Sequence, residues 1–246
     1  MGCSSGPDII QDGLVLCLDA ASIRSYPKSG TTWSDLAENR SGTMTNGLSF
    51  DAANAGTILF DGSDEKVVLS CPPVKYTNWQ KFSYNCWFKH IGKIGQNTSI
   101  GRQYIVDFRH DGELAGFGVY VDGLSSQSQE LTSFFKTTNS SGSFDESTVY
   151  SYNNFGEWIN HSFTVDKTAS SNHVKDYING ELVYTRSMSF STATEGGNNI
   201  TIGDYSRTNS GFLFNGYISL LTVNTGIIFT PEQVRQNYLS TKERFA

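Results

Sequence analysis

The sequence is poor in charge and has no long hydrophobic run. Charged residues make up 17% of its 246 residues, and the formal net charge is −6. Proteins that bind nucleic acids or anionic membranes usually present a basic face, because contacts to phosphate groups dominate the affinity. No segment approaches the roughly 20 consecutive apolar residues that a membrane-spanning helix needs. The composition therefore argues against nucleic acid and membrane as partners.

The first residues also lack the features of a targeting signal. The segment Met1–Gly6 has no basic stretch followed by an apolar one, and Gly6 stands where a myristoylation signal carries Ser or Thr. Two of the four cysteines, Cys17 and Cys86, alternate with apolar neighbours, so we expect free buried thiols in a reducing compartment. The cysteines are too widely spaced for a zinc site, and no histidine pair completes one. We predict no metal and no cofactor.

Sequence patterns of catalytic sites are missing as well. A glycosidase needs two carboxylates facing the scissile bond, and no alternating strand carries acids two residues apart. Asp64-Glu65 and Asp145-Glu146 are adjacent, so on a strand their side chains would point to opposite faces. His161 lies on an apolar strand face, where a hydrogen-bonded core histidine is expected. Acids on separate strands could still converge, but we predict no catalytic residue and no enzyme.

The sequence is rich in short β-type runs that turn residues separate, which is typical of a sandwich or barrel. Asn179-Gly180 predicts a two-residue hairpin, because both residues accept positive φ. Phe82–Phe88 alternates between a greasy face and a wetter one. The predicted strands are Leu14–Leu18, Thr57–Phe60, Lys66–Leu69, Phe82–Phe88, Gln103–Arg109, Gly116–Val121, Leu131–Lys136, Thr148–Tyr152, Trp158–Val165, Val174–Ile178, Glu181–Thr185, Ile200–Gly203 and Phe212–Val223.

One helix is predicted, at about 230–243. Thr230 can cap it, Pro231 suits its first position, and Gln233 completes a capping box. Val234 and Tyr238 fall four residues apart on one face, which we expect to pack on the sheet.

Five segments resemble, in order, those of concanavalin A-like, laminin-G-type domains. They are Phe60–Val67, Phe82–Phe88, Gly156–His161, Tyr177–Gly180, and Ile202-Gly203 together with Phe214–Ile218. The resemblance implies an all-β fold, a two-sheet antiparallel β-sandwich (jelly roll) with one short helix. It covers one domain at 13–246, preceded by an arm at 1–12. Relatives in this fold bind sugars, proteins or calcium, and some hydrolyse glycans. Where relatives often carry acids, this chain reads Ile218–Leu221, so no calcium is predicted.

Further segments resemble a subgroup that is frequent among structural proteins of tailed bacteriophages. They are Gly13–Ala20, Ser25–Pro27, Gly30–Leu36, Thr230–Tyr238 and Arg244-Phe245. The resemblance implies a non-enzymatic virion protein, either decorating the capsid or associated with the tail, that assembles in the bacterial cytoplasm. Its partners would be capsid or tail subunits, with host-surface glycan and self-association left open. The alternatives are a carbohydrate-binding module for host polysaccharide and a glycoside hydrolase or lyase.

The strand faces suggest where a ligand could bind. If Tyr104, Val106 and Phe108 are buried, Asp107 and Arg109 point outward. If Phe117, Val119 and Val121 are buried, Tyr120 also points outward. Neighbouring strands would then present one face carrying Asn85, Trp87, Asp107, Arg109 and Tyr120. Hydrogen-bonding groups around aromatic rings suit a sugar or a protein partner.

Each of these candidates also has a structural explanation. Asp107 and Arg109 can form a solvated cross-strand pair, and Trp87 can be ordinary core beneath a loop. Three further candidates, Tyr205, Arg207 and Asn209, occupy a predicted loop before the last strand, where a plain turn is the alternative.

Overall fold

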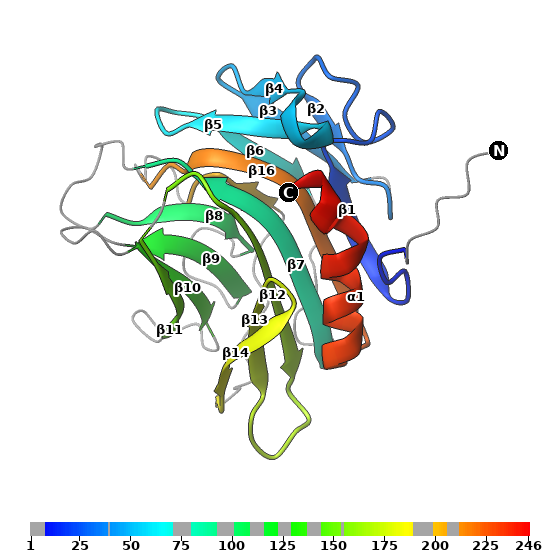
Figure 1. The fold of residues 1–246 in the computed structure, drawn as a ribbon, viewed down its shortest axis with the longest axis vertical. Coiled ribbons are helices and arrows are strands. Elements are labelled where there is room, and N and C mark those ends of the chain that lie inside the picture. Colours follow the sequence, from blue (N-terminus) through cyan, green and yellow to red (C-terminus); the bar gives the residue numbers. More distant parts are fainter. Residues whose placement is uncertain are drawn as a thin grey trace.

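Two antiparallel β-sheets face each other in a sandwich, with one helix along its outside (Figure 1). The computed structural model describes residues 8–38, 40–70, 80–92, 101–108, 116–122, 129–136, 144–153, 155–188, 199–205 and 212–246. The predicted all-β sandwich with a single short α-helix is confirmed within these residues.

The first sheet has the strand order β14-β13-β12-β7-β16-β5-β4, and β1 also pairs with β16. Its strands are β1 (Leu14–Asp19), β4 (Ser49–Asp51), β5 (Thr57–Asp61), β7 (Lys81–His90), β12 (Trp158–Asp166), β13 (Val174–Ile178), β14 (Glu181–Arg186) and β16 (Asn215–Thr225). A single 3-10 turn, η1 (Ala53–Ala55), links β4 to β5.

The second sheet has the order β11-β10-β9-β8-β15-β6-β3-β2. Its strands are β2 (Thr32–Ser34), β3 (Ser41–Thr45), β6 (Lys66–Ser70), β8 (Gln103–Asp107), β9 (Gly116–Asp122), β10 (Gln129–Lys136), β11 (Phe144–Tyr152) and β15 (Asn199–Ile202). β2, β3 and β4 were not predicted, and β11 begins earlier than expected because Phe144–Ser147 pairs with β10.

The main core fills the space between the sheets. Strand β7 contributes Phe82, Tyr84, Cys86 and Phe88 to this core, and they form the apolar face that the alternation predicted. The opposite face of β7 was expected to be solvent-exposed, and this expectation was wrong. Ser83, Asn85 and Trp87 are all buried, because a second layer covers the outer face of the first sheet.

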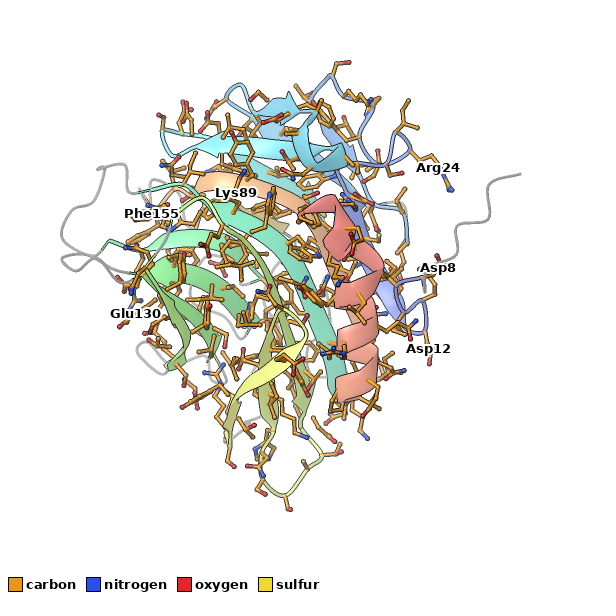
Figure 2. The ribbon with its side chains drawn as sticks, viewed as in Figure 1. Asp8, Asp12, Arg24, Lys89, Glu130 and Phe155 are labelled. Atoms are coloured by element: carbon orange, nitrogen blue, oxygen red, sulfur yellow. The ribbon has the colours of Figure 1, made fainter. Side chains whose placement is uncertain are left out.

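That second layer consists of the N-terminal segment from residue 8 and the helix α1 (Pro231–Thr241), which a 3-10 turn, η3 (Lys242–Arg244), follows. The predicted capping box at Thr230 and Gln233 is present. Val234 packs with Tyr177 and Phe229 on the sheet. Figure 2 shows Asp8 and Asp12 beside α1, on the opposite side of the view from Glu130 in the second sheet.

A buried carboxylate holds the loop after β2 against β1. Asp35 is 4% exposed and accepts hydrogen bonds from the backbone N–H groups of Cys17, Ala37, Glu38 and Arg40, at 2.7, 2.9, 2.9 and 3.4 Å. Three of these donors belong to the loop and one to β1, so the Asp35 carboxylate pairs buried backbone groups and ties the loop to the strand.

Several local predictions are confirmed. Asn179 and Gly180 both have positive φ and join β13 to β14 as a hairpin. Cys17 and Cys86 are free and buried, and burial raises the pKa of each thiol to about 12. Cys3 and Cys71 lie outside the described residues. Among the residues that the structure describes, no helix has the length and apolar character needed to cross a membrane.

Candidate functional site

Aromatic side chains gather on the outer face of the second sheet, on the side away from α1. We call the set the aromatic cluster; it comprises Tyr104, Tyr120, Phe134, Tyr205 and Phe212. Tyr104 of β8 lies directly opposite Tyr120 of β9 in the antiparallel register, with their rings 5.3 Å apart. The ring of Tyr205 lies 5.2 Å from that of Tyr104 and 5.6 Å from that of Phe212. The cluster therefore spans the central strands of the sheet.

Strand periodicity explains why Tyr120 faces outward. Its neighbours Phe117, Val119 and Val121 enter the main core, as predicted, so the alternation turns Tyr120 to the other face.

Tyr104 faces outward for a different reason. A register shift between Tyr104 and Val106 lets both Ile105 and Val106 enter the core. A β-bulge of this kind re-aims one side chain relative to its neighbours. The expectation that Tyr104 shares the inner face with Val106 and Phe108 was therefore wrong.

A glycine makes room for the base of the cluster. Gly118 lies on β9 beneath Phe134, and a Cβ there would stand 2.3 Å from the ring and 2.8 Å from the backbone oxygen of Val106. Phe134 can lie against the sheet only because position 118 has no side chain.

An arginine is clamped over this aromatic surface. The guanidinium of Arg102 lies 4.6 Å from the ring centre of Tyr120 and donates to both carboxylate oxygens of Glu146, at 3.1 Å each. It also approaches Asp122 at 3.4 Å. The three charged side chains are 26–30% exposed, so the group is partly open to solvent. Burial raises the pKa of Tyr120, which therefore stays a neutral phenol.

Access to the cluster is limited to its margin. Tyr104, Tyr120 and Phe134 are at most 5% exposed, whereas Tyr205 and Phe212 are half-buried. The parts that can touch a ligand are therefore Arg102 with its two carboxylates, over Tyr120, and the rings of Tyr205 and Phe212, which pack on the neighbouring Tyr104. A guanidinium and carboxylates beside aromatic rings can bind the hydroxyl groups and apolar face of a sugar, or a polar protein surface.

The five predicted face residues do not lie on one face. Asp107 and Tyr120 both lie on the outer side of the second sheet, and Asp107 is fully buried opposite Gly118. Asn85 and Trp87 belong to β7, which pairs with β12 and β16 in the first sheet. The chain crosses to the other sheet between β7 and β8, so the assumption that these strands are neighbours was wrong.

Asn85 and Trp87 are instead packed under the outer layer. Asn85 is 1% exposed and accepts from the amide of Asn160 at 2.8 Å and the hydroxyl of Ser162 at 2.9 Å. The Trp87 ring stacks on Phe245, and its indole N–H donates to Thr241 at 2.8 Å. Of the other candidates, Tyr205 belongs to the aromatic cluster, and Arg109, Arg207 and Asn209 lie outside the described residues.

A carboxyl pair that the sequence did not reveal lies at the turn between β5 and β6. Burial and a hydrogen bond to the Asp61 carboxyl raise the pKa of Glu65, and the same bond lowers the pKa of Asp61. Glu65 also accepts from the backbone N–H of Asp61 at 3.2 Å. Two carboxyls in direct contact are closer than the about 5–9.5 Å that glycosidases leave between theirs. The two side chains therefore form a hydrogen-bonded carboxyl pair within the turn, with one proton between them.

A second buried group contains serine, histidine and aspartate. His161 Nε2 lies 3.1 Å from Asp176 Oδ1, and the Ser133 hydroxyl donates to the same oxygen at 2.8 Å. Arg186 donates to Ser133 from the other side. In a nucleophilic triad the serine would bond to the histidine, whereas here both bond to the carboxylate. His161 is thus the hydrogen-bonded core histidine that the sequence predicted.

In the part of the chain that the structure describes, no three His, Cys, Asp or Glu side chains converge in a way that could hold a metal ion. Where relatives often carry an acid, the Ser219 hydroxyl donates to the backbone oxygen of Gly56 at 2.8 Å.

Sequence reasoning missed Arg102, Asp122, Glu146 and Phe134. Arg102 precedes its strand, so periodicity gives no signal for it. The outward direction of Phe134 was implicit in the inward direction of Leu131 and Phe135 on the same strand.

Comparison with known proteins bears on the fold. Residues 61–235 match a laminin G family model described as the concanavalin A-like lectin/glucanases superfamily. No curated protein sequence matches the chain.

Similar solved structures include parts of botulinum neurotoxins. One is from botulinum neurotoxin type C, a toxin whose entry into cells depends on interaction with two ganglioside molecules (TM-score 0.67, 15% identity, 93% of this chain and 51% of that chain). Another is the binding domain of botulinum neurotoxin DC in complex with rat synaptotagmin II (TM-score 0.66, 14% identity, 93% and 52%). A third is the serotype D binding domain (TM-score 0.66, 12% identity, 93% and 52%). At these identities the similarity concerns the fold, and this chain spans about half the length of each of those chains.

Proposed function

Because the chain belongs to the concanavalin A-like lectin/glucanases superfamily, we propose that it is a non-enzymatic recognition domain that binds a glycan or a protein surface. The binding face is the outer side of the second sheet, at Arg102 and the margin of the aromatic cluster. The observation that carries the proposal is the guanidinium of Arg102, held by two bonds to Glu146 over the ring of Tyr120 and still 28% exposed.

The geometry of Arg102 favours recognition. Its fork is fixed by the bidentate contact, so little rotamer entropy is lost when a ligand binds. The carboxylates of Glu146 and Asp122 lie beside it, and carboxylate oxygens accept hydrogen bonds from sugar hydroxyls or from donors of a protein. The half-buried rings of Tyr205 and Phe212, which pack on Tyr104, add apolar surface to the same sheet face.

The acids of this face argue for binding over hydrolysis. Glu146 and Asp122 are ion-paired to one arginine, and Glu130 accepts from the Thr148 hydroxyl at 3.3 Å. A glycosidase needs two carboxyls that face a scissile bond, whereas these two carboxylates contact the same guanidinium. The glycoside hydrolase or lyase alternative thus gains no support from this site.

The broader setting that we propose is the virion of a tailed bacteriophage, with assembly in the bacterial cytoplasm. It is supported by the resemblance of Gly13–Ala20, Gly30–Leu36 and Thr230–Tyr238 to phage structural proteins, and by the acidic net charge. The domain would decorate the capsid or associate with the tail, and contact neighbouring subunits or host-surface glycan. A carbohydrate-binding module outside a virion is the alternative with the same binding face.

A glycan array and a pull-down of phage particles test the proposal together. We expect saturable binding in at least one assay, weakened about tenfold or more by Arg102→Ala, since a charge-assisted hydrogen bond contributes roughly that factor. Tyr205→Ala is expected to weaken it as well. Arg235→Ala and Tyr184→Ala are matched controls, because both side chains are exposed on the first-sheet side of the molecule.

Two outcomes would contradict the proposal. A blank array together with no association with assembled particles removes the recognition role. Release of reducing ends from a polysaccharide panel would instead favour the hydrolase alternative. Co-purification with assembled particles separates the virion setting from the carbohydrate-binding module.

A further inference from the structure

The chain's own Arg244 and Phe245 pack on the outer face of the first sheet. These two residues are here called the latch; Arg244 is the last residue of η3, and Phe245 follows it. They contact five side chains from five different elements, here called the latch site: Asp19 of β1, Asn54 of η1, Trp87 of β7, Trp158 of β12 and Ser219 of β16.

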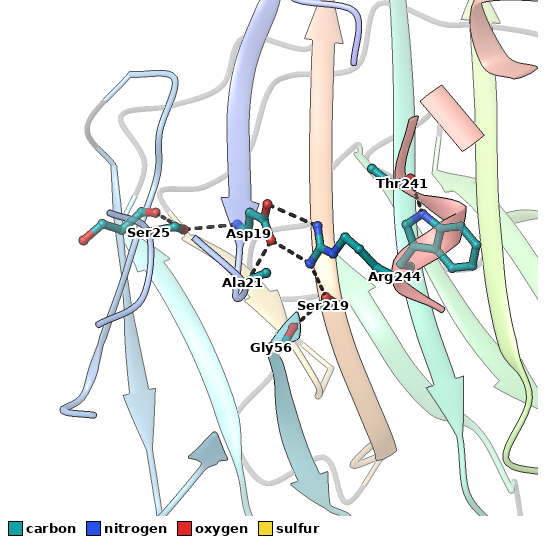
Figure 3. Close-up of polar contacts among 9 residues, drawn as sticks. Asp19, Ala21, Ser25, Gly56, Ser219, Thr241 and Arg244 are labelled. Atoms are coloured by element: carbon teal, nitrogen blue, oxygen red, sulfur yellow. Dashed lines mark hydrogen bonds and ion pairs between the residues drawn. The ribbon is translucent and has the colours of Figure 1, made fainter. Parts of the chain in front are cut away.

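The guanidinium of Arg244 is bound through both of its terminal nitrogens. Nη1 donates to Asp19 Oδ2 at 3.2 Å, and Nη2 donates to Asp19 Oδ1 and to Ser219 Oγ at 2.9 Å each (Figure 3). The Arg244 and Asp19 side chains are 20% and 23% exposed, which places the pair in a partly desolvated setting. A bidentate arginine–carboxylate contact is both strong and selective in direction.

Asp19 and Ser219 are oriented without help from the latch. Asp19 Oδ1 accepts from the backbone N–H of Ala21 at 3.0 Å, and the Ser219 hydroxyl gives its proton to the Gly56 carbonyl (Figure 3). Ser219 therefore has only lone pairs left for Arg244. Groups fixed in this way form a binding site in advance of the ligand.

The phenylalanine of the latch enters a slot between two tryptophans. The Phe245 ring lies 4.2 Å from the Trp87 ring, nearly parallel to it, and 4.6 Å from the Trp158 ring. Trp158 is held by its indole N–H, which donates to Asn54 Oδ1 at 3.1 Å. The amide of Asn54 in turn donates to the backbone oxygen of Arg244 at 3.0 Å, so the site also binds the main chain of the latch.

Four of the five latch-site residues lie on strands of the first sheet, whereas α1 is anchored through a different cluster. Val234 and Phe229 hold α1 and the segment before it through a separate cluster with Tyr177. Losing the latch contacts thus leaves the main helix anchor in place. From these contacts we infer that the latch site is a peptide-binding site for an arginine followed by an aromatic residue, and that the protein fills it with its own Arg244-Phe245.

The test opens the site and offers the latch in trans. The double variant Arg244→Ala/Phe245→Ala keeps the chain length and removes both latch side chains. A fluorescein-labelled peptide with the sequence of residues 240–246 is titrated against it, with fluorescence anisotropy as the readout. We expect saturable binding to the variant and at least about tenfold weaker binding to the native protein, because a tethered competitor acts at millimolar effective concentration.

Specificity is tested on both partners. A control peptide with alanine at both latch positions is expected not to bind. Asp19→Asn, added to the double variant, is expected to weaken binding of the native-sequence peptide about tenfold or more, since it removes a charge-assisted bidentate contact. Asp64→Asn is the matched control, because Asp64 is exposed at the turn before β6 and outside the latch site.

Three results overturn the inference: no peptide binding to a folded double variant, equal binding of the control peptide, or equal binding to the native protein. Near-ultraviolet circular dichroism reports whether the double variant is folded. If it is not, the single variant Phe245→Ala takes its place, because its Arg244 still pairs with Asp19; the same three results then decide. Glycan binding by the second sheet is independent of all of them.

Discussion

The substitution Trp87→Ala separates a packing role for this residue from a ligand-binding one. Trp87 is 3% exposed, its ring stacks on Phe245 at 4.2 Å and on Tyr238 at 5.6 Å, and its indole N–H bonds to Thr241. Truncating a buried tryptophan to alanine lowers the free energy of unfolding by about 3–5 kcal/mol. For a chain of this length that loss corresponds to a fall in melting temperature of roughly 6–20 °C.

Thermal and urea unfolding followed by circular dichroism measure this loss. Trp87→Phe is the control, because a phenyl ring keeps part of the stacking while the indole hydrogen bond and one ring are lost; its cost should lie between about 1 kcal/mol, for the hydrogen bond alone, and that of Trp87→Ala. In a double-mutant cycle, Trp87→Ala and Phe245→Ala are expected to couple by about 0.5–1.5 kcal/mol, the range for aromatic pairs.

A loss below about 1 kcal/mol for Trp87→Ala would refute this account, because surface substitutions typically fall in that range. If the variant stayed stable and instead lost glycan or protein binding, Trp87 would be a ligand contact, as its outward direction on the strand first suggested.

Three other perturbations test the remaining structure. Asp35→Ala leaves four backbone N–H groups without their acceptor and is expected to cost at least about 2 kcal/mol in urea unfolding; Asp51→Ala, which frees a single exposed N–H, should cost less than half of that, and equal losses would contradict the role given to Asp35. Gly118→Ala places a methyl group against an aromatic ring and a backbone oxygen and should cost about 1–3 kcal/mol, so an unchanged unfolding midpoint would show that the ring is free to move. The raised pKa of Glu65 stabilises the fold below the ordinary value of 4.5 and ceases to do so as the pH rises through the raised pKa, whereas the lowered pKa of Asp61 acts in the opposite sense, above its own ordinary value. Glu65→Gln stays neutral, so its stability relative to the native protein should increase with pH from about 4 to 8; a difference independent of pH would contradict the shared proton.

The two outer faces of the sandwich differ in what they can do. The face of the first sheet is covered by the N-terminal segment, α1 and the latch, and its aromatic residues Trp87 and Trp158 are engaged within the chain. No helix among the described residues covers the face of the second sheet, and Arg102 is partly exposed there. A peptide that binds the latch site would therefore have to displace the latch.

Local sequence patterns predicted much of the fold. The alternation in Phe82–Phe88 identified the core face of β7, Asn179-Gly180 identified a hairpin, and Thr230 with Gln233 identified the start of α1. Each of these features depends on residues within a few positions of one another, because strand alternation, turn conformation and helix capping are local. The ordered segments that resemble laminin-G-type domains then identified the sandwich.

The position of the candidate site required tertiary structure. From the sequence, Asn85, Trp87, Asp107 and Tyr120 all turn away from the core, and the structure agrees. Yet β7 and β8 lie in different sheets, so the outward residues of one are on the opposite side of the molecule from those of the other. A bulge in β8 added Tyr104 to the outer face, which strict alternation had assigned to the core.

The sequence by itself determined which side of its strand a side chain occupies wherever the strand is regular, because that depends only on the period of two along the backbone; the bulge at Tyr104 is an exception. Tertiary structure alone decided which strands are neighbours and which outer face is covered. Strand pairing and the docking of α1 join residues more than a hundred positions apart, as Trp87 and Thr241 show, and no local pattern encodes such a contact.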